Sequence, residues 1–381
     1  MTELTREDRR MLTDGIAAIL GKTGVRGQSV GGYPAPDAAV WRELCELGIL
    51  ALPVPPEQGG LGLGFQEIGP VMRALGGFAS VEPFVATVVL GAGAVLKSEN
   101  ASLRESVLPA MASGELKLAL AYAEPGSRHA LNHVSTRAAA DGDGHVLSGH
   151  KAVVLGATDA DRIVVSARTA GDVAEAAGIA LFVVDRSAPG VTVQDYFLID
   201  GRRAGEVLLD NVRVGPDGLL AGPDEGLAVL ERVIDEATIA ACHESVGAME
   251  RLNELSLEYC RERVAFGQPI ARNQVIQHRL VDMHVAVEHA SAMAEAATDV
   301  LSGAAGGDAR PIVSAAKVSL ARESKFVGEA AVHLHGAGGT TEDVDVGRYF
   351  KRLLVNMMLF GDSDHHLQRY LDTRSSSLEA K

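Results

Sequence analysis

The chain contains 381 residues, 47% hydrophobic and 22% charged, which is the balance of a folded globular protein large enough for two or three structural units. Its formal net charge of −15 argues against a nucleic-acid groove or an anionic membrane surface as its partner. The three cysteines, Cys45, Cys242 and Cys260, are far apart and include no CxxC pair, so we expect neither a disulfide framework nor a thiolate zinc site.

The N-terminal segment MTELTREDRRML is charged from its start, unlike a secretory signal. No apolar run reaches the roughly 18–20 residues that a membrane span requires. We therefore expect a cytoplasmic protein that does not bind membranes.

Residues 1–115 predict an N-terminal α-helical domain. Thr5 and Asp8 have the spacing of an N-terminal cap, ahead of an amphipathic run that continues to Leu20. A second helix is predicted from Asp37 to Gly48, because glycine commonly follows a helix end. The Pro/Gly-rich stretch ALPVPPEQGGLGLG predicts a loop, and further helices are predicted near residues 65–76, 81–97 and 101–113.

Residues 116–222 predict a central β domain. Seven short segments rich in β-branched residues are separated by turns: LKLALAYA, HVLSG, KAVVL, RIVVSAR, GIALFVVD, VTVQD and EVLLD. The turn ADGDG, between VSTRAAA and HVLSG, is a strong hairpin signal. Because no helical pattern interrupts these segments, they predict a small antiparallel barrel or sandwich.

Residues 223–381 return to a helical period and predict a C-terminal four-helix bundle. The first helix would run for about forty residues, or roughly 60 Å, and would stop before Gly267 and Pro269. Three more long helices are predicted near 274–302, 311–335 and 344–370. The predicted fold class is therefore α+β, mostly α, with the β domain between two helical domains.

Three motifs resemble those of the acyl-CoA dehydrogenase family. RERVAFGQPIARNQVIQHRLVDM (261–283) is similar to the family's FAD-binding helix–turn–helix, and HLHGAGGTTEDVDVGRYFKR (333–352) to its glycine-rich turn. AYAEPGS (121–127) is similar to the strand that approaches the flavin. The resemblance covers nearly the whole chain, with the three domains in the family's order. The ending LFGDSDHHL resembles the small-subunit type, as in pimeloyl-CoA dehydrogenase.

The resemblance implies FAD as the cofactor. Arg263 would lie at the end of the long helix, where a guanidinium can grip a pyrophosphate through two parallel hydrogen bonds. A solvated cation at a helix end is the simpler alternative. Gln274 opens the next helix, where free backbone N–H groups favour an anion. The other cofactor-binding candidates are Phe266, His333, Gly336, Ala337, Ala123 and Leu155.

Several candidates depart from the family's pattern. Ala337 stands where a second glycine is usual, and Ala123 stands where the family has threonine before Glu-Pro. Val153 and Leu155 occupy the places of the family's Trp and Thr beside the flavin ring. The chain therefore lacks an aromatic wall and a hydroxyl donor at a flavin pocket of its own.

The family's reaction removes an α-proton from an acyl-CoA thioester and transfers the β-hydrogen as hydride to flavin N5, so a carboxylate base is needed. Alignment on Gly361 puts Phe360 at the base position, whereas alignment on the LQR of 367–369 puts Asp362 there. A second family location falls on Ala237, and neighbouring Glu236 would point about 100° away on a helix. We therefore predict Asp362 as the base.

The segment MMLFGDSDHHLQRY (357–370) allows two further interpretations. On a helix, Asp362, His365 and His366 would share a face that could hold a metal. No third ligand group is evident in the sequence, so we predict no metal site. Asp362 or Ser363 could instead cap the start of a helix.

Three functional hypotheses remain open. The first is a homotetrameric FAD-dependent acyl-CoA dehydrogenase that passes electrons to an electron-transferring flavoprotein. The second is a largely non-catalytic small subunit of an α₂β₂ heterotetramer, which completes the FAD site of a second acyl-CoA dehydrogenase chain. The third is an acyl-CoA oxidase or flavin monooxygenase with the same fold.

Overall fold

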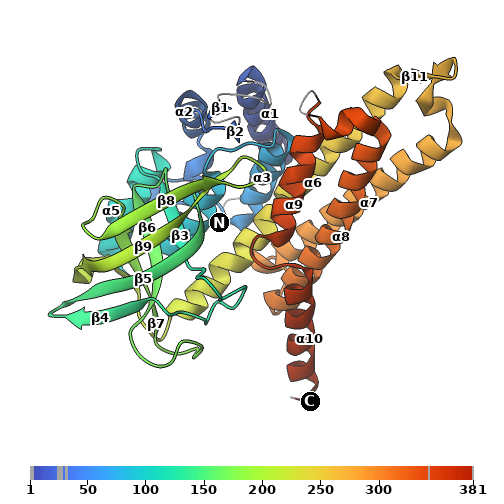
Figure 1. Cartoon of the computed structure of the whole chain (residues 1–381). Coiled ribbons are helices and arrows are strands. Elements are labelled where there is room, and N and C mark those ends of the chain that lie inside the picture. Colours follow the sequence, from blue (N-terminus) through green and yellow to red (C-terminus); the bar gives the residue numbers. More distant parts are fainter. Residues whose placement is uncertain (1–3, 24–28, 31–32, 342–343, 380–381) are drawn as a thin grey trace. The chain divides into compact units, whose positions relative to one another are not determined.

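The computed structural model describes residues 4–23, 29–30, 33–341 and 344–379, which fall into two compact units (Figure 1). The first, called the β unit here, comprises Gln28–Leu63 and Val81–Ala237. The second, called the helical unit, comprises Glu3–Gly27, Gly64–Ser80 and Thr238–Lys381. Within the described residues, no helix is both long enough and apolar enough to cross a membrane.

The N-terminal segment of the helical unit begins with the predicted cap. The Asp8 N–H donates to Thr5 Oγ1 at 3.1 Å, and the Thr5 N–H donates to the Asp8 carboxylate at 3.1 Å. This reciprocal pair is a capping box, and it confirms the predicted helix start. The elements here are α1 (Arg6–Thr23), the 3₁₀ turn η3 (Phe65–Glu67) and α3 (Ile68–Gly77).

In the β unit the helix predicted from Asp37 begins at that residue, which is its N-cap. The Ala39 N–H donates to Asp37 Oδ1 at 2.8 Å, and α2 ends before Gly48, whose φ is +86°. The segment predicted as a helix at 81–97 is helical but contains a π-helix. The helical elements are α2 (Ala38–Glu46), η1 (Ile49–Ala51), η2 (Pro56–Gln58), π-helix η4 (Val85–Ala92), α4 (Gly93–Leu96) and α5 (Ala101–Ala112).

The rest of the β unit is one mixed sheet of eight strands, in the order β10-β7-β6-β4-β5-β9-β8 with β3 beside β6 (Figure 1). The strands are β3 (Leu118–Ala121), β4 (Arg137–Asp141), β5 (Gly144–Leu155), β6 (Arg162–Arg168), β7 (Ile179–Asp185), β8 (Val191–Phe197), β9 (Arg203–Val214) and β10 (Leu219–Ala221). The short elements are the hairpin β1 (Ser29–Val30) and β2 (Tyr33–Pro34), and η5 (Pro216–Gly218).

The sheet confirms the predicted hairpin, because Asp141 pairs with Gly144 across the turn. Two details differ from the prediction. HVLSG and KAVVL form the single strand β5, and β3 runs parallel to β6. The described strands form no closed barrel, and a sandwich-like core remains the fitting description. That core includes Ile163, Val165, Phe182 and Val207, none of which is exposed.

The C-terminal part of the chain forms the predicted long helices. They are α6 (Gly226–Glu262), α7 (Gln274–Leu301), α8 (Ala309–His335), α9 (Val346–Met358) and α10 (Ser363–Glu379). The helix predicted at 344–370 is two helices, because Phe360 and Gly361 have φ values of +60° and +114°, which an α-helix cannot include. In the helical unit the helices share a core that includes Met249, Leu252, Met283, Leu320 and Leu353.

Candidate functional site

A hairpin projects between α6 and α7, and it contains the predicted Arg263–Gln274 element. Strands β11 (Val264–Ala265) and β12 (Gln268–Pro269) pair across a two-residue turn made by Phe266 and Gly267, with φ of +54° and +79°. Two successive positive φ values define a type I′ turn. The short 3₁₀ turn η6 (Ile270–Arg272) leads into α7. We call residues 261–275 the arm.

The arm presents Arg263 and Gln274 to solvent. The Arg263 backbone is fixed, because its N–H donates to Tyr259 O at 2.8 Å and its carbonyl accepts from the Ile270 N–H at 2.9 Å. The Arg263 side chain is exposed, and within the described residues it has no hydrogen bond or ion pair. Gln274 is the exposed first residue of α7, whose N-cap Asn273 makes no side-chain cap. The first N–H groups of α7 are therefore available to an external acceptor.

Phe266, at the tip of the arm, is the most exposed large apolar residue of the described chain, at 105%. Val264 and Val275 are also exposed, at 58% and 71%. Apolar side chains gathered on a projecting element are typical of a contact surface. The arm therefore joins a cationic group and a helix N-terminus to an apolar tip.

The glycine-rich turn lies at the end of α8. His333 is exposed in the last turn of the helix, and Gly336 has φ of +60°. Gly336 and Ala337 belong to the 3₁₀ turn η7 (Gly336–Thr340), and both are exposed. A Cβ added to Gly336 would meet no atom within 4 Å, so the turn is open on that side. The structure brings these three predicted residues together, as the motif indicated.

Asp362 lies in the junction between α9 and α10. Its Oδ1 accepts from the His365 N–H at 2.9 Å, so it caps the start of α10 as one interpretation predicted. Asp362 precedes the helix, and His366 is buried with a hydrogen bond to Phe360 O. Among the described residues, no group of three potential ligands could hold a metal ion.

The strand positions of the predicted flavin site meet in the β unit. The Ala152 N–H donates to Ala123 O at 2.8 Å, which places the AYAEPGS segment beside β5. Val153 lies in a bulge of β5 with φ of +52° and is 45% exposed, whereas Leu155 is buried. A positive φ is uncommon for a β-branched residue. Neither Ala123 nor Leu155 carries a side-chain hydrogen-bonding group.

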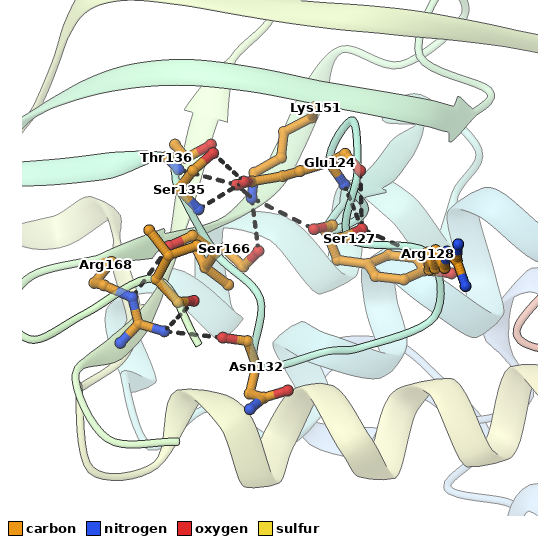
Figure 2. A network of polar contacts seen from close by, with 12 residues as sticks. Glu124, Ser127, Arg128, Asn132, Ser135, Thr136, Lys151, Ser166 and Arg168 are labelled. Atoms are coloured by element: carbon orange, nitrogen blue, oxygen red, sulfur yellow. Dashed lines mark hydrogen bonds and ion pairs between the residues drawn. The ribbon is translucent and has the colours of Figure 1, made fainter. Parts of the chain in front are cut away.

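Next to Ala123 lies a buried ion pair that sequence reasoning missed (Figure 2). Lys151 Nζ donates to Glu124 Oε1 at 2.6 Å and to Ser166 Oγ at 3.0 Å, and neither charged side chain is exposed. The Glu124 carboxylate also accepts from the backbone N–H groups of Ser135, at 2.6 Å, and Thr136, at 3.0 Å. The pair thus joins four separate segments of the β unit: Glu124 after β3, Ser135 and Thr136 before β4, Lys151 in β5 and Ser166 in β6.

Burial and charge act in opposite directions on this pair. Burial acts to raise the pKa of Glu124, but the Lys151 charge and the hydrogen bonds lower that pKa to about 2. Burial also lowers the pKa of Lys151 to about 8, against the attraction of Glu124. The sequence held one signal for this pair, a lone charged residue in an otherwise apolar or small-residue stretch. These residues are the glutamate of EP and the lysine of HKAVV.

Figure 2 also shows Arg168, whose guanidinium is surrounded by backbone carbonyls. It donates to Val134 O at 3.1 Å, Asn132 O at 2.9 Å and Ala177 O at 2.7 Å. These bonds hold the segment before β4 and the loop between β6 and β7. The arrangement is structural, since these acceptors are carbonyls of the chain itself.

Glu236, considered above as a poor substitute for the base, forms an ion pair. Its carboxylate contacts Lys97 Nζ at 2.6 Å and Arg232 Nε at 3.0 Å, and its side chain is 12% exposed. Both carboxylate oxygens are therefore engaged by cations of the chain itself. This observation agrees with leaving Glu236 out of the predicted site.

The helical unit contains a second buried polar network. Arg352 contacts Glu244, and Asn356 Nδ2 donates to Glu244 Oε2 at 2.9 Å and to Ser245 Oγ at 3.1 Å. Arg352 also donates to Ser80 O at 2.8 Å. The run HES in an otherwise apolar part of α6 was the sequence signal for this network.

A cavity of about 1140 Å³ also lies within the helical unit. It is lined by α1, α3, α6 and α7, and its polar lining includes Arg73, which forms an ion pair with Glu250, and His243. His243 Nε2 lies 2.8 Å from Thr298 Oγ1, which donates to Ala294 O, so His243 is the donor to Thr298. The predicted site residues do not line this cavity.

A chain with helices, then a β sheet, then a bundle of helices has the architecture of a flavin-dependent dehydrogenase. Sequence models of three acyl-CoA dehydrogenase domains match it in order: the N-terminal domain over residues 25–115, the middle domain over 119–212 and the C-terminal domain over 224–372. The chain therefore belongs to the acyl-CoA dehydrogenase family, whose members are FAD-dependent oxidoreductases.

Similar proteins span almost the whole chain. The probable acyl-CoA dehydrogenase YngJ of Bacillus subtilis is 27% identical, over 98% of each chain. The human mitochondrial short-chain specific acyl-CoA dehydrogenase is 26% identical, over 86% of this chain and 80% of the human protein.

Two similar solved structures are of paired proteins. A variant of the Tcur3481–Tcur3483 steroid ACAD is 26% identical with a TM-score of 0.85. The ChsE4–ChsE5 complex from Mycobacterium tuberculosis is 25% identical with a TM-score of 0.86. Each match covers 98% of this chain and 99% of the other one.

The residues of the chain fit FAD in one part and not in another. The exposed Arg263 guanidinium and the uncapped start of α7 have the charge and donors that a pyrophosphate requires. Ala123 and Leu155 could offer a flavin ring only backbone groups, and Leu155 is buried. The arm thus has charge and donors of the kind that suit a dinucleotide, and side-chain donors for the ring are missing at Ala123 and Leu155.

Proposed function

We propose that this chain takes part in the α,β-desaturation of an acyl-CoA thioester, with its arm gripping FAD at a seam between subunits. The observation that carries the proposal is the exposed Arg263 side chain, which has no partner within the described residues, beside the uncapped start of α7. An unpaired guanidinium next to free N–H groups suits a diphosphate. The apolar tip at Phe266 supports contact with another chain.

In this proposal Arg263 and Gln274 hold the pyrophosphate, and the open turn of His333, Gly336 and Ala337 allows a second close backbone approach. FAD, when bound, supplies the hydride acceptor for the β-hydrogen. Asp362 takes the α-proton of the thioester, since it is the carboxylate of the segment where the family has its base. Electrons would then pass to an electron-transferring flavoprotein.

A second candidate function is favoured by Ala123 and Leu155, which give the flavin ring no side-chain donors. In that case the chain is the small-subunit type, as in pimeloyl-CoA dehydrogenase, and completes the FAD site of a different family member. The two paired structures similar to this chain support such an assembly.

The visible spectrum of the purified protein tests the seam and separates these two functions. A stoichiometric flavin spectrum from the chain alone would support the homotetramer. A colourless chain that gives a yellow complex only with a co-expressed family member would support the heterotetramer.

In either case Arg263→Ala should lose bound FAD, and Arg263→Lys should retain little of it, because lysine cannot make the two parallel bonds. Full FAD occupancy in Arg263→Ala would reject the proposal that the arm grips FAD at a seam between subunits.

A panel of acyl-CoA thioesters with an artificial electron acceptor tests the reaction. Asp362→Asn should lower turnover by at least about a hundredfold, since general-base catalysis contributes about 10²–10⁴. Unchanged turnover would reject Asp362 as the base. Steady turnover with oxygen alone would favour an oxidase or monooxygenase instead.

A further inference from the structure

The junction between α9 and α10 has a strained backbone. Phe360 has φ of +60° and Gly361 has φ of +114°, and the two follow each other. A bulky residue such as phenylalanine seldom adopts a positive φ, which persists only where the surroundings impose it. The contacts that impose this turn come from α8 and α10.

Lys317 of α8 holds the end of α9. Its side chain is fully buried, and its Nζ donates to the carbonyls of Asn356 and Leu359, the second at 2.7 Å. The last carbonyls of a helix have no partner within the helix and carry partial negative charge. A buried ammonium at this place therefore satisfies them and fixes where α9 stops.

His366 of α10 holds the turn from its other side. The residue is 1% exposed, and its Nε2 lies 3.1 Å from Phe360 O, which can only accept, so Nε2 carries a proton. Its Nδ1 lies 3.3 Å from Ser314 Oγ of α8. Burial, assisted by the Lys317 charge, lowers the pKa of His366 to about 3, so the ring stays neutral with one tautomer.

The imidazoles also fill the space around Gly361. A Cβ added to Gly361 would lie 2.6 Å from His365 Cδ2 and 2.7 Å from His366 Nε2. The turn is therefore closed on one side by Lys317 and on the other by the two rings. Asp362, the next residue, is bound through Oδ1 to the His365 N–H at 2.9 Å.

We propose that Lys317 and His366 are positioning residues that clamp the 359–362 turn and so fix the Asp362 carboxylate. Neither residue is a candidate for contact with the reacting atoms, because each is almost fully buried against the chain itself. The catalytic part of this inference rests on the proposed role of Asp362. The clamp itself is a separate property of the fold.

Hydrogen exchange of the backbone amides of residues 359–366, in the purified protein, tests the clamp without turnover or bound flavin. His366→Leu and Lys317→Met should each accelerate this exchange by about tenfold or more. His366→Gln, which retains an N–H donor, should restore most of the protection. Lys325→Met, which removes an exposed lysine of the same helix, is the matched control and should change nothing. Native-like exchange in both clamp variants would overturn the clamp.

Steady-state kinetics of the assembled enzyme test the positioning. His366→Leu should lower kcat by about tenfold or more while KM stays within about twofold, because substrate binding does not depend on the clamp. His366→Gln should recover kcat. An unchanged kcat with accelerated exchange would overturn the positioning role and leave the clamp. Full turnover by Asp362→Asn would instead overturn the base assignment, a separate result from the exchange experiment.

Discussion

At the scale of single residues, the chain depends on buried charges that have specific partners. Glu124 and Lys151 are both fully buried, and each is the main counterion of the other. Bringing two charges out of water is costly, so such a pair adds little net stability while both members are present. The loss of one member leaves the other charged, buried and unpaired.

Lys151→Met should therefore reduce the free energy of unfolding of the β unit by about 3–5 kcal/mol. The double variant Lys151→Met with Glu124→Gln should recover part of this loss, because no unpaired charge is left buried. The recovery should be incomplete, because Ser135 and Thr136 donate to different carboxylate oxygens and the amide has only one. Urea unfolding followed by Trp41 fluorescence measures the free energy of unfolding of the β unit, since Trp41 is the single tryptophan and lies in this unit.

A surface pair provides the control for that experiment. Arg213 contacts Asp141 at 3.2 Å, and the Arg213 side chain is 82% exposed. Arg213→Met should cost less than about 1 kcal/mol. Equal losses in Arg213→Met and Lys151→Met would contradict the importance of burial.

The buried histidines predict a loss of stability in acid. Burial lowers the pKa of His366 to about 3 and that of His243 to about 4, below the 6.5 of an exposed histidine. Between pH 6.5 and 4 these two histidines therefore bind protons in the unfolded chain but not in the native chain. Each histidine contributes stability that is complete above pH 6.5 and falls by about 1.4 kcal/mol per pH unit below it.

Glu82 acts in the opposite direction, because burial raises its pKa to about 7, so between pH 7 and 4.5 the native chain holds a proton that the unfolded chain lacks. The comparison of the native chain with His366→Gln isolates one histidine. Between pH 6.5 and 4.5, the stability of the variant, from urea midpoints by circular dichroism, should fall less steeply by about 1.4 kcal/mol per pH unit. Parallel slopes would contradict a neutral, buried His366.

At the scale of elements, features that depend on neighbouring residues could be predicted from sequence. Features that depend on contacts between residues far apart in the chain could not. The cap at Thr5–Asp8, the helix start at Asp37 and the hairpin at ADGDG were predicted, since each depends on neighbours within a few residues. The split between α9 and α10 was missed, because it depends on Lys317, some 40 residues away in the sequence. The Glu124–Lys151 pair was missed for the same reason.

The α9–α10 junction also predicts the effect of one methyl group. Gly361→Ala should destabilise the helical unit by about 1–3 kcal/mol, because alanine would be strained at φ of +114° and would contact the His366 ring. Gly306→Ala is the control in the same unit, since its added Cβ meets nothing within 4 Å and its φ is not positive in the strained range. Thermal unfolding by circular dichroism should separate the two variants clearly.

The candidate site shows the same division between local and distant information. Arg263 and Gln274 could be placed from sequence, because a two-residue hairpin fixes the geometry between two helices. The role of Asp362 as a helix cap was foreseen as one of several interpretations and is present in the structure. In the proposed function the contacts of the flavin ring depend on how the subunits assemble, and short sequence motifs do not encode that assembly.

At the scale of the whole molecule, we predict that the tip of the arm contributes to assembly of the subunits and not to folding of the chain. Asn-Gly is preferred over Phe-Gly in a type I′ turn, so Phe266→Asn should retain the hairpin while removing the apolar tip. We expect the thermal stability of the isolated chain to stay within about 0.5 kcal/mol, and the assembly to dissociate to smaller species. Light scattering coupled to size-exclusion chromatography measures the mass.

Leu61→Asn is the control for this prediction, because Leu61 is 54% exposed but lies in the β unit outside the arm. Its mass distribution should match that of the native chain. An assembly that tolerates Phe266→Asn as well as Leu61→Asn would show that the tip of the arm is not a subunit contact.

The arm also determines where a protease can cut. Arg261, Arg263 and Arg272 are exposed on or beside a narrow two-stranded projection, and trypsin cleaves after arginine. A free chain should therefore be nicked early at these bonds, whereas a chain whose arm is sheltered by a neighbour should resist. The digestion pattern of a crude preparation would then report, before any spectrum is recorded, whether the polypeptide is assembled with another subunit.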